Sequence, residues 1–148
     1  MVPVWIRDIV ALIARVGIGV IFIAHGWRKV FTDGVGETAA GFREAGVPLP
    51  GLSAWFVALV ELFGGLAMII GLLVPVAGVL LAAIMLGAFV FVHAEHGVFV
   101  DEGGGELVFA LGATSLLLAV TGAGRLSLDH LWRPLTRHRA ARHPQHTV

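Results

Sequence analysis

The sequence predicts an all-α membrane protein in which four transmembrane helices form a single bundle. Two observations carry this prediction. Of the 148 residues, 57% are hydrophobic and only 14% are charged, whereas charged residues make up about 25% of a soluble globular domain. The apolar residues also gather in long runs, and a helix that crosses a bilayer needs about 20 of them.

The first apolar run predicts a helix over residues 9–25, with Trp5 and Trp27 on either side of it. At the rise of an α-helix the two indoles lie roughly 33 Å apart, about the thickness of the hydrocarbon core. Tryptophans at this spacing are typical of the two membrane interfaces. Because Arg15 interrupts the apolar run, we expect a membrane-spanning helix and not a cleavable signal peptide.

The central stretch, residues 53–93, predicts two further helices over residues 54–73 and 76–93. Pro75 lies in its middle and lacks the backbone donor that a continuous helix would need there. Glu61 is the one charged side chain in the stretch. About forty apolar residues with a helix breaker halfway therefore indicate a transmembrane helical hairpin.

The rest of the chain adds a fourth helix, predicted over residues 106–121. A short interfacial helix is predicted over residues 127–135, where leucines and a tryptophan recur at helical spacing. These elements define a transmembrane domain over residues 1–132, followed by a basic tail, residues 136–148, that we expect to be disordered. The one long loop, residues 28–52, is compatible with a short interfacial helix or with a plain surface loop.

Charge predicts the orientation of the bundle. Four spans place both termini on one side of the membrane, where six Lys and Arg residues lie against three on the other side. Because the side richer in Lys and Arg usually faces the cytoplasm, both termini are predicted to be cytoplasmic and the long loop to face outward.

Ionisable side chains within the predicted spans are the candidates for function. A charge at membrane depth is costly, so such a group usually faces the bundle interior and a partner. The helical rise puts Arg15 and Glu61 within roughly 5 Å of each other along the membrane normal, and we expect them to form an ion pair. This pair either locks two helices or belongs to a site, and the residues alone leave both interpretations open.

A polar cluster of Arg15, Glu61, His93 and Glu106, open toward the outer side, is therefore predicted. The candidate catalytic residues are Glu61 and Arg15, and the candidate ligand-binding residues are His93, Glu106, His25, Phe22 and Trp55. No metal ligand set is predicted. The chain contains no cysteine, which excludes thiol–disulfide chemistry, thiolate metal sites and iron–sulfur clusters within it.

Several motifs resemble those of the DoxX family of small four-helix bacterial membrane proteins. They are F-I-A-H-G-W-R-K at residues 22–29, F-R-E-A-G-V-P at 42–48, E-L-F-G-G-L at 61–66 and G-A-G-R-L-S-L-D at 122–129. The resemblance, which covers roughly residues 9–132, implies a multi-pass protein of the bacterial inner membrane. Some members of this family are subunits of a thiosulfate:quinone oxidoreductase, and mycobacterial members belong to an assembly with superoxide dismutase and a sulfurtransferase.

Three functions are compatible with these residues. The first is a membrane subunit of a redox or oxidative-stress assembly that binds a quinone at the polar cluster. The second is a scaffold without chemistry of its own. The third is a small transporter, or a metal or haem site that uses His25 and His93. In each case we expect contact with the lipid bilayer and with partner subunits and no nucleic-acid binding, and a homo-oligomer is compatible with the sequence.

Overall fold

The computed structural model describes residues 2–131. This part of the chain is helical and contains no β-strand, which confirms the all-α prediction. Its α-helices are α1 (Val4–Trp27), α2 (Val35–Glu44), α3 (Pro50–Ile70), α4 (Val74–Ala88) and α5 (Glu106–Thr121). Two π-helical segments, η1 (Arg28–Thr32) and η2 (Phe89–His93), continue α1 and α4, and η3 (Val100–Glu102) is a 3-10 turn.

Three of these helical stretches are long and apolar enough to cross a membrane. They are Val4–Thr32, Pro50–Ile70 and Val74–His93. The fourth apolar helix, Glu106–Thr121, is shorter. The first stretch is longer than predicted at both ends, because no proline or glycine interrupts residues 4–9 and because η1 continues the helix beyond Trp27.

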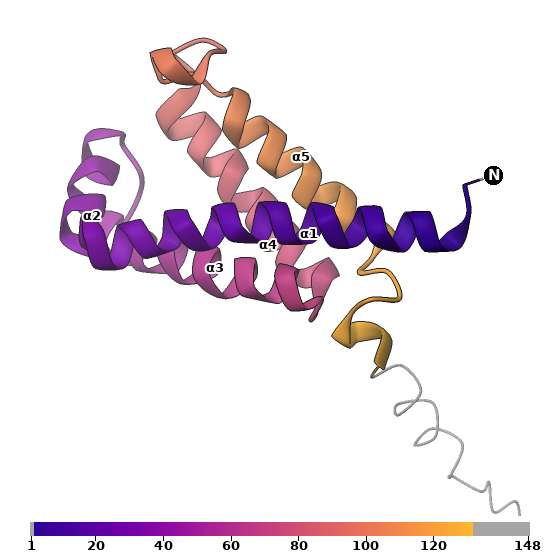
Figure 1. The fold of residues 1–148 in the computed structure, drawn as a ribbon. Coiled ribbons are helices and arrows are strands. Elements are labelled where there is room, and N and C mark those ends of the chain that lie inside the picture. Colours follow the sequence, from indigo (N-terminus) through magenta and orange to yellow (C-terminus); the bar gives the residue numbers. More distant parts are fainter. Residues whose placement is uncertain (1, 132–148) are drawn as a thin grey trace, which may run out of the picture.

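The helices form two antiparallel pairs, α1 with α3 and α4 with α5 (Figure 1). The pairs lie close together near the connection between α3 and α4 and diverge toward α2 (Figure 1). Glycines set the register of the first pair. A Cβ atom on Gly19 would lie 2.7 Å from the carbonyl oxygen of Gly65, and one on Gly26 would lie 2.9 Å from that of Ala58. Small residues at these positions let the two backbones approach.

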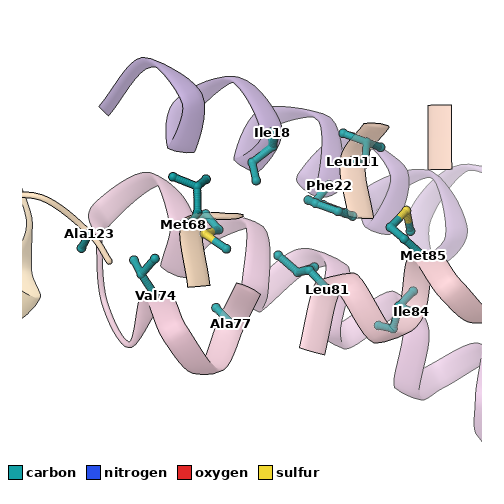
Figure 2. Packing of buried hydrophobic residues seen from close by; sticks show 11 residues of the cluster. Ile18, Phe22, Met68, Val74, Ala77, Leu81, Ile84, Met85, Leu111 and Ala123 are labelled. Carbon is teal, nitrogen blue, oxygen red and sulfur yellow. The ribbon is translucent and has the colours of Figure 1, made fainter. Parts of the chain in front are cut away.

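One apolar cluster joins the two pairs (Figure 2). Val74 and Ala123 lie at one end of it, and Ile84 and Met85 lie at the other (Figure 2). Many large apolar side chains point outward instead, as Phe63 does with 66% of its surface exposed. Outward apolar side chains on helices of this length contact the lipid bilayer.

The turn between α3 and α4 is held by a residue from the C-terminal part of the chain. Leu73 has a φ of 50°, in the left-handed region, which costs roughly 1–2 kcal/mol for a residue with a Cβ atom. The carboxylate of Asp129 accepts hydrogen bonds from the backbone N–H groups of Leu73 at 2.7 Å and Val74 at 3.0 Å. These bonds satisfy two donors at the start of α4 and offset the strain of the turn.

The predicted interfacial helix over residues 127–135 is described only in its first part. Residues 128–131 are helical, and the remainder lies outside the described residues, as does the tail, residues 136–148. The long loop contains the short helix α2, which packs against α3.

Candidate functional site

Arg15 does not pair with Glu61, so the predicted ion pair is wrong. Arg15 is fully buried. Its Nη1 donates to the carbonyl of Ala123 at 2.6 Å, and its Nη2 donates to that of Leu126 at 2.7 Å. Because both carbonyls lie in the segment that follows α5, Arg15 holds this segment against α1.

The register of the first helix pair explains why the two side chains do not meet. With Gly19 facing Gly65, Glu61 lies level with Ile23, eight positions from Arg15 on the helix. Eight positions correspond to roughly 12 Å along the axis. The prediction assumed a shorter first helix and therefore placed Arg15 too close to Glu61.

Glu61 pairs with Lys29. The Lys29 ammonium lies 3.0 Å from Oε1 and 2.7 Å from Oε2 of Glu61. Only 3% of the Glu61 side chain and 20% of the Lys29 side chain are exposed. The charge of the buried Glu61 carboxylate is thus compensated by Lys29, which lies in the segment predicted to be a loop.

A signal for Lys29 was present in the sequence. Arg15, Phe22 and Lys29 follow one another at seven-residue steps, which places them on one face of a continuous helix. By this register Lys29 lies six positions beyond Ile23, and the two side chains meet because each tilts toward the N-terminus of its own helix. The pattern alone did not reveal that the helix extends so far.

A cavity of about 610 Å³ lies where the two helix pairs diverge. Phe22, Met85 and Leu111, members of the apolar core, form part of its wall. Phe42 and Val47 contribute from α2 and from the loop that follows it. Ligand pockets in proteins are typically 300–1,000 Å³, mostly apolar, with a few polar groups that orient the ligand. The cavity fits this description.

Four polar side chains line the cavity: His25, Lys29, Ser53 and His93. The hydroxyl of Ser53 donates to the carbonyl of Pro48 at 2.7 Å. The Nδ1 atom of His93 lies 2.6 Å from the carbonyl oxygen of Gly103. Because a carbonyl oxygen only accepts, Nδ1 is the donor, and the Nε2 atom of the neutral ring is left as an acceptor.

Three of the predicted ligand-binding residues, Phe22, His25 and His93, line the cavity. Trp55 does not, and half of its surface is exposed; its neighbour Phe56 takes part in the lining instead. The predicted cluster of four side chains therefore does not form. Glu61 reaches the cavity only through Lys29.

Glu106 has a local contact outside the cavity. It begins α5, is exposed, and accepts a hydrogen bond from the backbone N–H of Val100 at 2.9 Å. Within residues 2–131, no group of three or more His, Asp or Glu side chains is arranged to hold a metal ion.

Both π-helical segments contribute residues to the cavity wall. Lys29 belongs to η1, and Phe91 and His93 belong to η2. A π turn holds an extra residue and so changes the direction of the side chains beyond it, and such turns occur often at functional sites. The two segments thus orient one cation and one imidazole toward the same space.

Comparisons with known proteins agree with the resemblance. The sequence profile of the family described as DoxX matches residues 10–94. "Putative oxidoreductase CatD" of Bacillus subtilis is 35% identical over 122 residues, which cover 82% of this chain and 86% of the relative.

Two proteins of Escherichia coli are also similar. "Inner membrane protein YqjF" is 35% identical over 131 residues, 85% of this chain and 94% of the relative. "Inner membrane protein YphA" is 29% identical over 128 residues, 83% and 90% of the two chains. No solved structure matches the chain.

Proposed function

The chain belongs to the DoxX family, and on this basis we propose that it is the membrane subunit of a redox assembly and binds a quinone in the cavity between its helix pairs. It is a multi-pass protein of the bacterial inner membrane. The observation that carries the proposal is the cavity of about 610 Å³. Its walls are mostly apolar and include one cation, Lys29, whose side chain is 20% exposed.

The residues that line the cavity fit a quinone. Phe22, Met85 and Leu111 offer apolar contacts to a ring, and Lys29 offers a donor to a ring oxygen. His25 and His93 can hold or pass a proton at their ring nitrogens. When bound, the quinone would supply the capacity to take up two electrons together with protons.

The ligand is proposed to enter from the lipid phase. Phe56 of α3 and Phe91 of η2 both line the cavity, yet 53% and 43% of their surfaces are exposed. In a bilayer these surfaces face acyl chains, and an apolar tail attached to the ring would extend between them. This arrangement suits a ligand that dissolves in the membrane.

A partner subunit is part of the proposal. One relative is named as a putative oxidoreductase, which supports the redox class for this chain. Because the chain has no cysteine, electrons would have to reach the cavity from a partner protein or a second bound group. Homo-oligomers are compatible with this role.

The experiment that tests the proposal is a binding measurement. Purified full-length protein in nanodiscs is titrated with ubiquinone-1 and with menaquinone-1, and binding is followed by tryptophan fluorescence and by calorimetry. We expect saturable binding of at least one of them. Absence of saturable binding with either class of native quinone would contradict the proposal.

A matched pair of variants tests whether the ligand binds in the cavity. A Cβ atom on Gly87, which lines the cavity, or on Gly17, which does not, meets no atom within 4 Å. Both positions are helical, so Gly87→Phe and Gly17→Phe change helix propensity equally. Gly87→Phe is expected to abolish quinone binding because its ring fills the cavity, and Gly17→Phe is expected to preserve it. Equal binding by both variants would place the ligand elsewhere.

The membrane topology is a further part of the proposal: α5 is the fourth span, and both termini are cytoplasmic. The natural absence of cysteine permits single-cysteine labelling. In intact spheroplasts, a membrane-impermeant maleimide should label Glu37→Cys and Glu102→Cys but not Arg125→Cys, which should react only after lysis. The reverse pattern would invert the orientation, and labelling of all three would contradict four spans.

A further inference from the structure

Lys29 and Glu61, the ion pair beside the cavity, have different roles in ligand binding. We propose that Lys29 donates a hydrogen bond to an oxygen of the bound ligand, and that Glu61 is a positioning residue that acts only through Lys29. This inference rests on the proposed function and deepens it, since it names the group that recognises the ligand and the chemistry that it selects.

The geometry gives Lys29 a donor to spare. An ammonium group carries three N–H donors, and two of them are directed to Oε1 and Oε2 of Glu61 at 3.0 and 2.7 Å. Within residues 2–131, Lys29 makes no other side-chain hydrogen bond. Lys29 lines the cavity and Glu61 does not, so the third donor is the one that a ligand can meet.

The charge of the pair predicts the class of ligand. Lys29 and Glu61 together are neutral, so the pair presents a donor without an excess positive charge. It therefore favours a neutral ligand with an oxygen acceptor and an apolar body over an organic anion. An analogue without the oxygen would leave the donor unpaired in an apolar cavity, and sites built in this way reject such analogues strongly.

The neighbouring cation is directed away from this task. The Arg28 Nε atom donates to Asp33 at 2.9 Å, and 72% of the Arg28 side chain is exposed. Arg28 does not line the cavity. Arg28→Met is therefore a matched control for Lys29→Met: it removes one cation from the same π-helical segment without touching the cavity.

A purely structural ion pair makes different predictions. It would fasten η1 to α3, and its loss would lower thermal stability while leaving the choice between ligands unchanged. The discriminating quantity is thus the ratio of affinities for two probes of the same shape, one with ring oxygens and one without. We choose ubiquinone-1 and the corresponding prenylated benzene that lacks the ring oxygens.

The experiment measures both affinities in nanodiscs for the wild type and the variants. Loss of one charge-assisted hydrogen bond should weaken ubiquinone-1 binding by Lys29→Met roughly tenfold to a hundredfold. Affinity for the hydrocarbon probe should not fall and should rise, because Lys29→Met removes the donor that this probe leaves unpaired. Lys29→Arg should restore most of the discrimination, and Arg28→Met should behave as wild type.

Glu61 is tested by a double-mutant cycle. Glu61→Gln should weaken ubiquinone-1 binding in the wild-type background and should have no further effect in the Lys29→Met background, since coupled residues are not additive. If Lys29→Met does not fold because it leaves Glu61 buried without a partner, the neutral double variant Lys29→Met/Glu61→Gln is compared with Glu61→Gln. The double variant should then bind ubiquinone-1 more weakly than Glu61→Gln, by a factor smaller than the full loss expected for Lys29→Met, and equal binding by the two variants would overturn the inference.

The outcomes separate this inference from the proposed function. Saturable quinone binding by the wild type with unchanged discrimination in Lys29→Met would overturn the inference alone. A Glu61→Gln effect that is equally large with and without Lys29 would show direct contact of Glu61 with the ligand and would also overturn it. No quinone binding by the wild type would remove the proposed function, and this inference with it.

Discussion

Arg15 and Leu126 are 111 positions apart in the sequence, and the Nη2 atom of Arg15 donates a hydrogen bond of 2.7 Å to the carbonyl of Leu126. Together with the bond to Ala123, this contact ties the segment after α5 to the first helix. The Arg15 guanidinium lies beside Gly71, at the connection between α3 and α4, and neither Arg15 nor Leu126 lines the cavity. The one fully buried arginine side chain of residues 2–131 thus has a structural contact that accounts for two of its donors.

Replacement of Arg15 should destabilise the protein strongly. Arg15→Met would leave the carbonyls of Ala123 and Leu126 without their donors, at a cost of about 2–4 kcal/mol in the free energy of unfolding. Arg15→Lys should cost less but still be measurable, because an ammonium lacks the planar fork that reaches two carbonyls. Thermal unfolding in detergent is the measurement. Stability equal to wild type in Arg15→Met would contradict the role described here.

Arg15 and Glu61 should act independently. They share no partner and lie roughly 12 Å apart along the helix pair, and substitutions at such distances usually add to within about 0.5 kcal/mol. The losses of stability in Arg15→Gln and Glu61→Gln should therefore sum to the loss in the double variant. A double variant that is more stable than either single variant would indicate that Arg15 and Glu61 form an ion pair, and would contradict the structure.

The α1–α3 contact should not tolerate a methyl group at Gly19. The added Cβ would lie 2.7 Å from the Gly65 carbonyl oxygen, and overpacking of this kind costs typically about 1–3 kcal/mol. Gly17→Ala is the matched control on the same helix, since its Cβ meets nothing within 4 Å. It should be neutral or stabilise by up to about 1 kcal/mol, because alanine is the better helix former. Equal effects of the two substitutions would mean that the helices do not approach here.

Asp129 should be required for the turn between α3 and α4. Asp129→Ala removes the acceptor of the Leu73 and Val74 N–H groups, and loss of a side-chain acceptor at the start of a helix costs about 0.5–2 kcal/mol. Asp129→Asn keeps one oxygen and should lie between alanine and wild type. Asp101→Ala, at an exposed carboxylate with no side-chain hydrogen bond within residues 2–131, is the control and should leave the unfolding temperature unchanged.

The sequence was sufficient for the class of fold because apolar runs and helix breakers are local features. The run through Glu61 and the break near Pro75 predict a helical hairpin without knowledge of any contact. The partner of Glu61 depends instead on the register of two helices, which close approach at Gly19 decides. The continuation of a helix beyond Trp27 in π geometry has no known local signature in this sequence.

The cavity was the part of the site that the sequence could not predict. Phe22, His25 and His93 were candidates because they lie on helix faces and near helix ends, and the structure brings them to one space. Their role in binding stays a prediction. Lys29 was missed because its position depends on the length of α1. Trp55 is outside the cavity wall and Phe56 is in it, since neighbouring side chains on a helix point about 100° apart.

If α5 is the fourth span, as proposed, its length has a consequence for the surrounding bilayer. Its 16 residues extend about 24 Å, some 6 Å less than a hydrocarbon core of about 30 Å. Val98, Phe99 and Val100 continue the apolar surface beyond the start of α5, with 63%, 61% and 52% of their surfaces exposed. Under that proposal we expect these three side chains to cover the end of α5 at the membrane interface, with Asp101 and Glu102 on the water side of them.

A loop at the membrane interface is stable only if its backbone groups have hydrogen-bond partners. The N–H of Gly105 donates to the carbonyl of Gly97 at 3.1 Å, that of Glu106 donates to the carbonyl of Val98 at 2.9 Å, and Val100 donates to the Glu106 carboxylate. Non-helical backbone outside water requires internal partners of this kind. Glu106 therefore holds these apolar side chains beside the start of α5, and if α5 spans the membrane they spare the bilayer from thinning around a short helix.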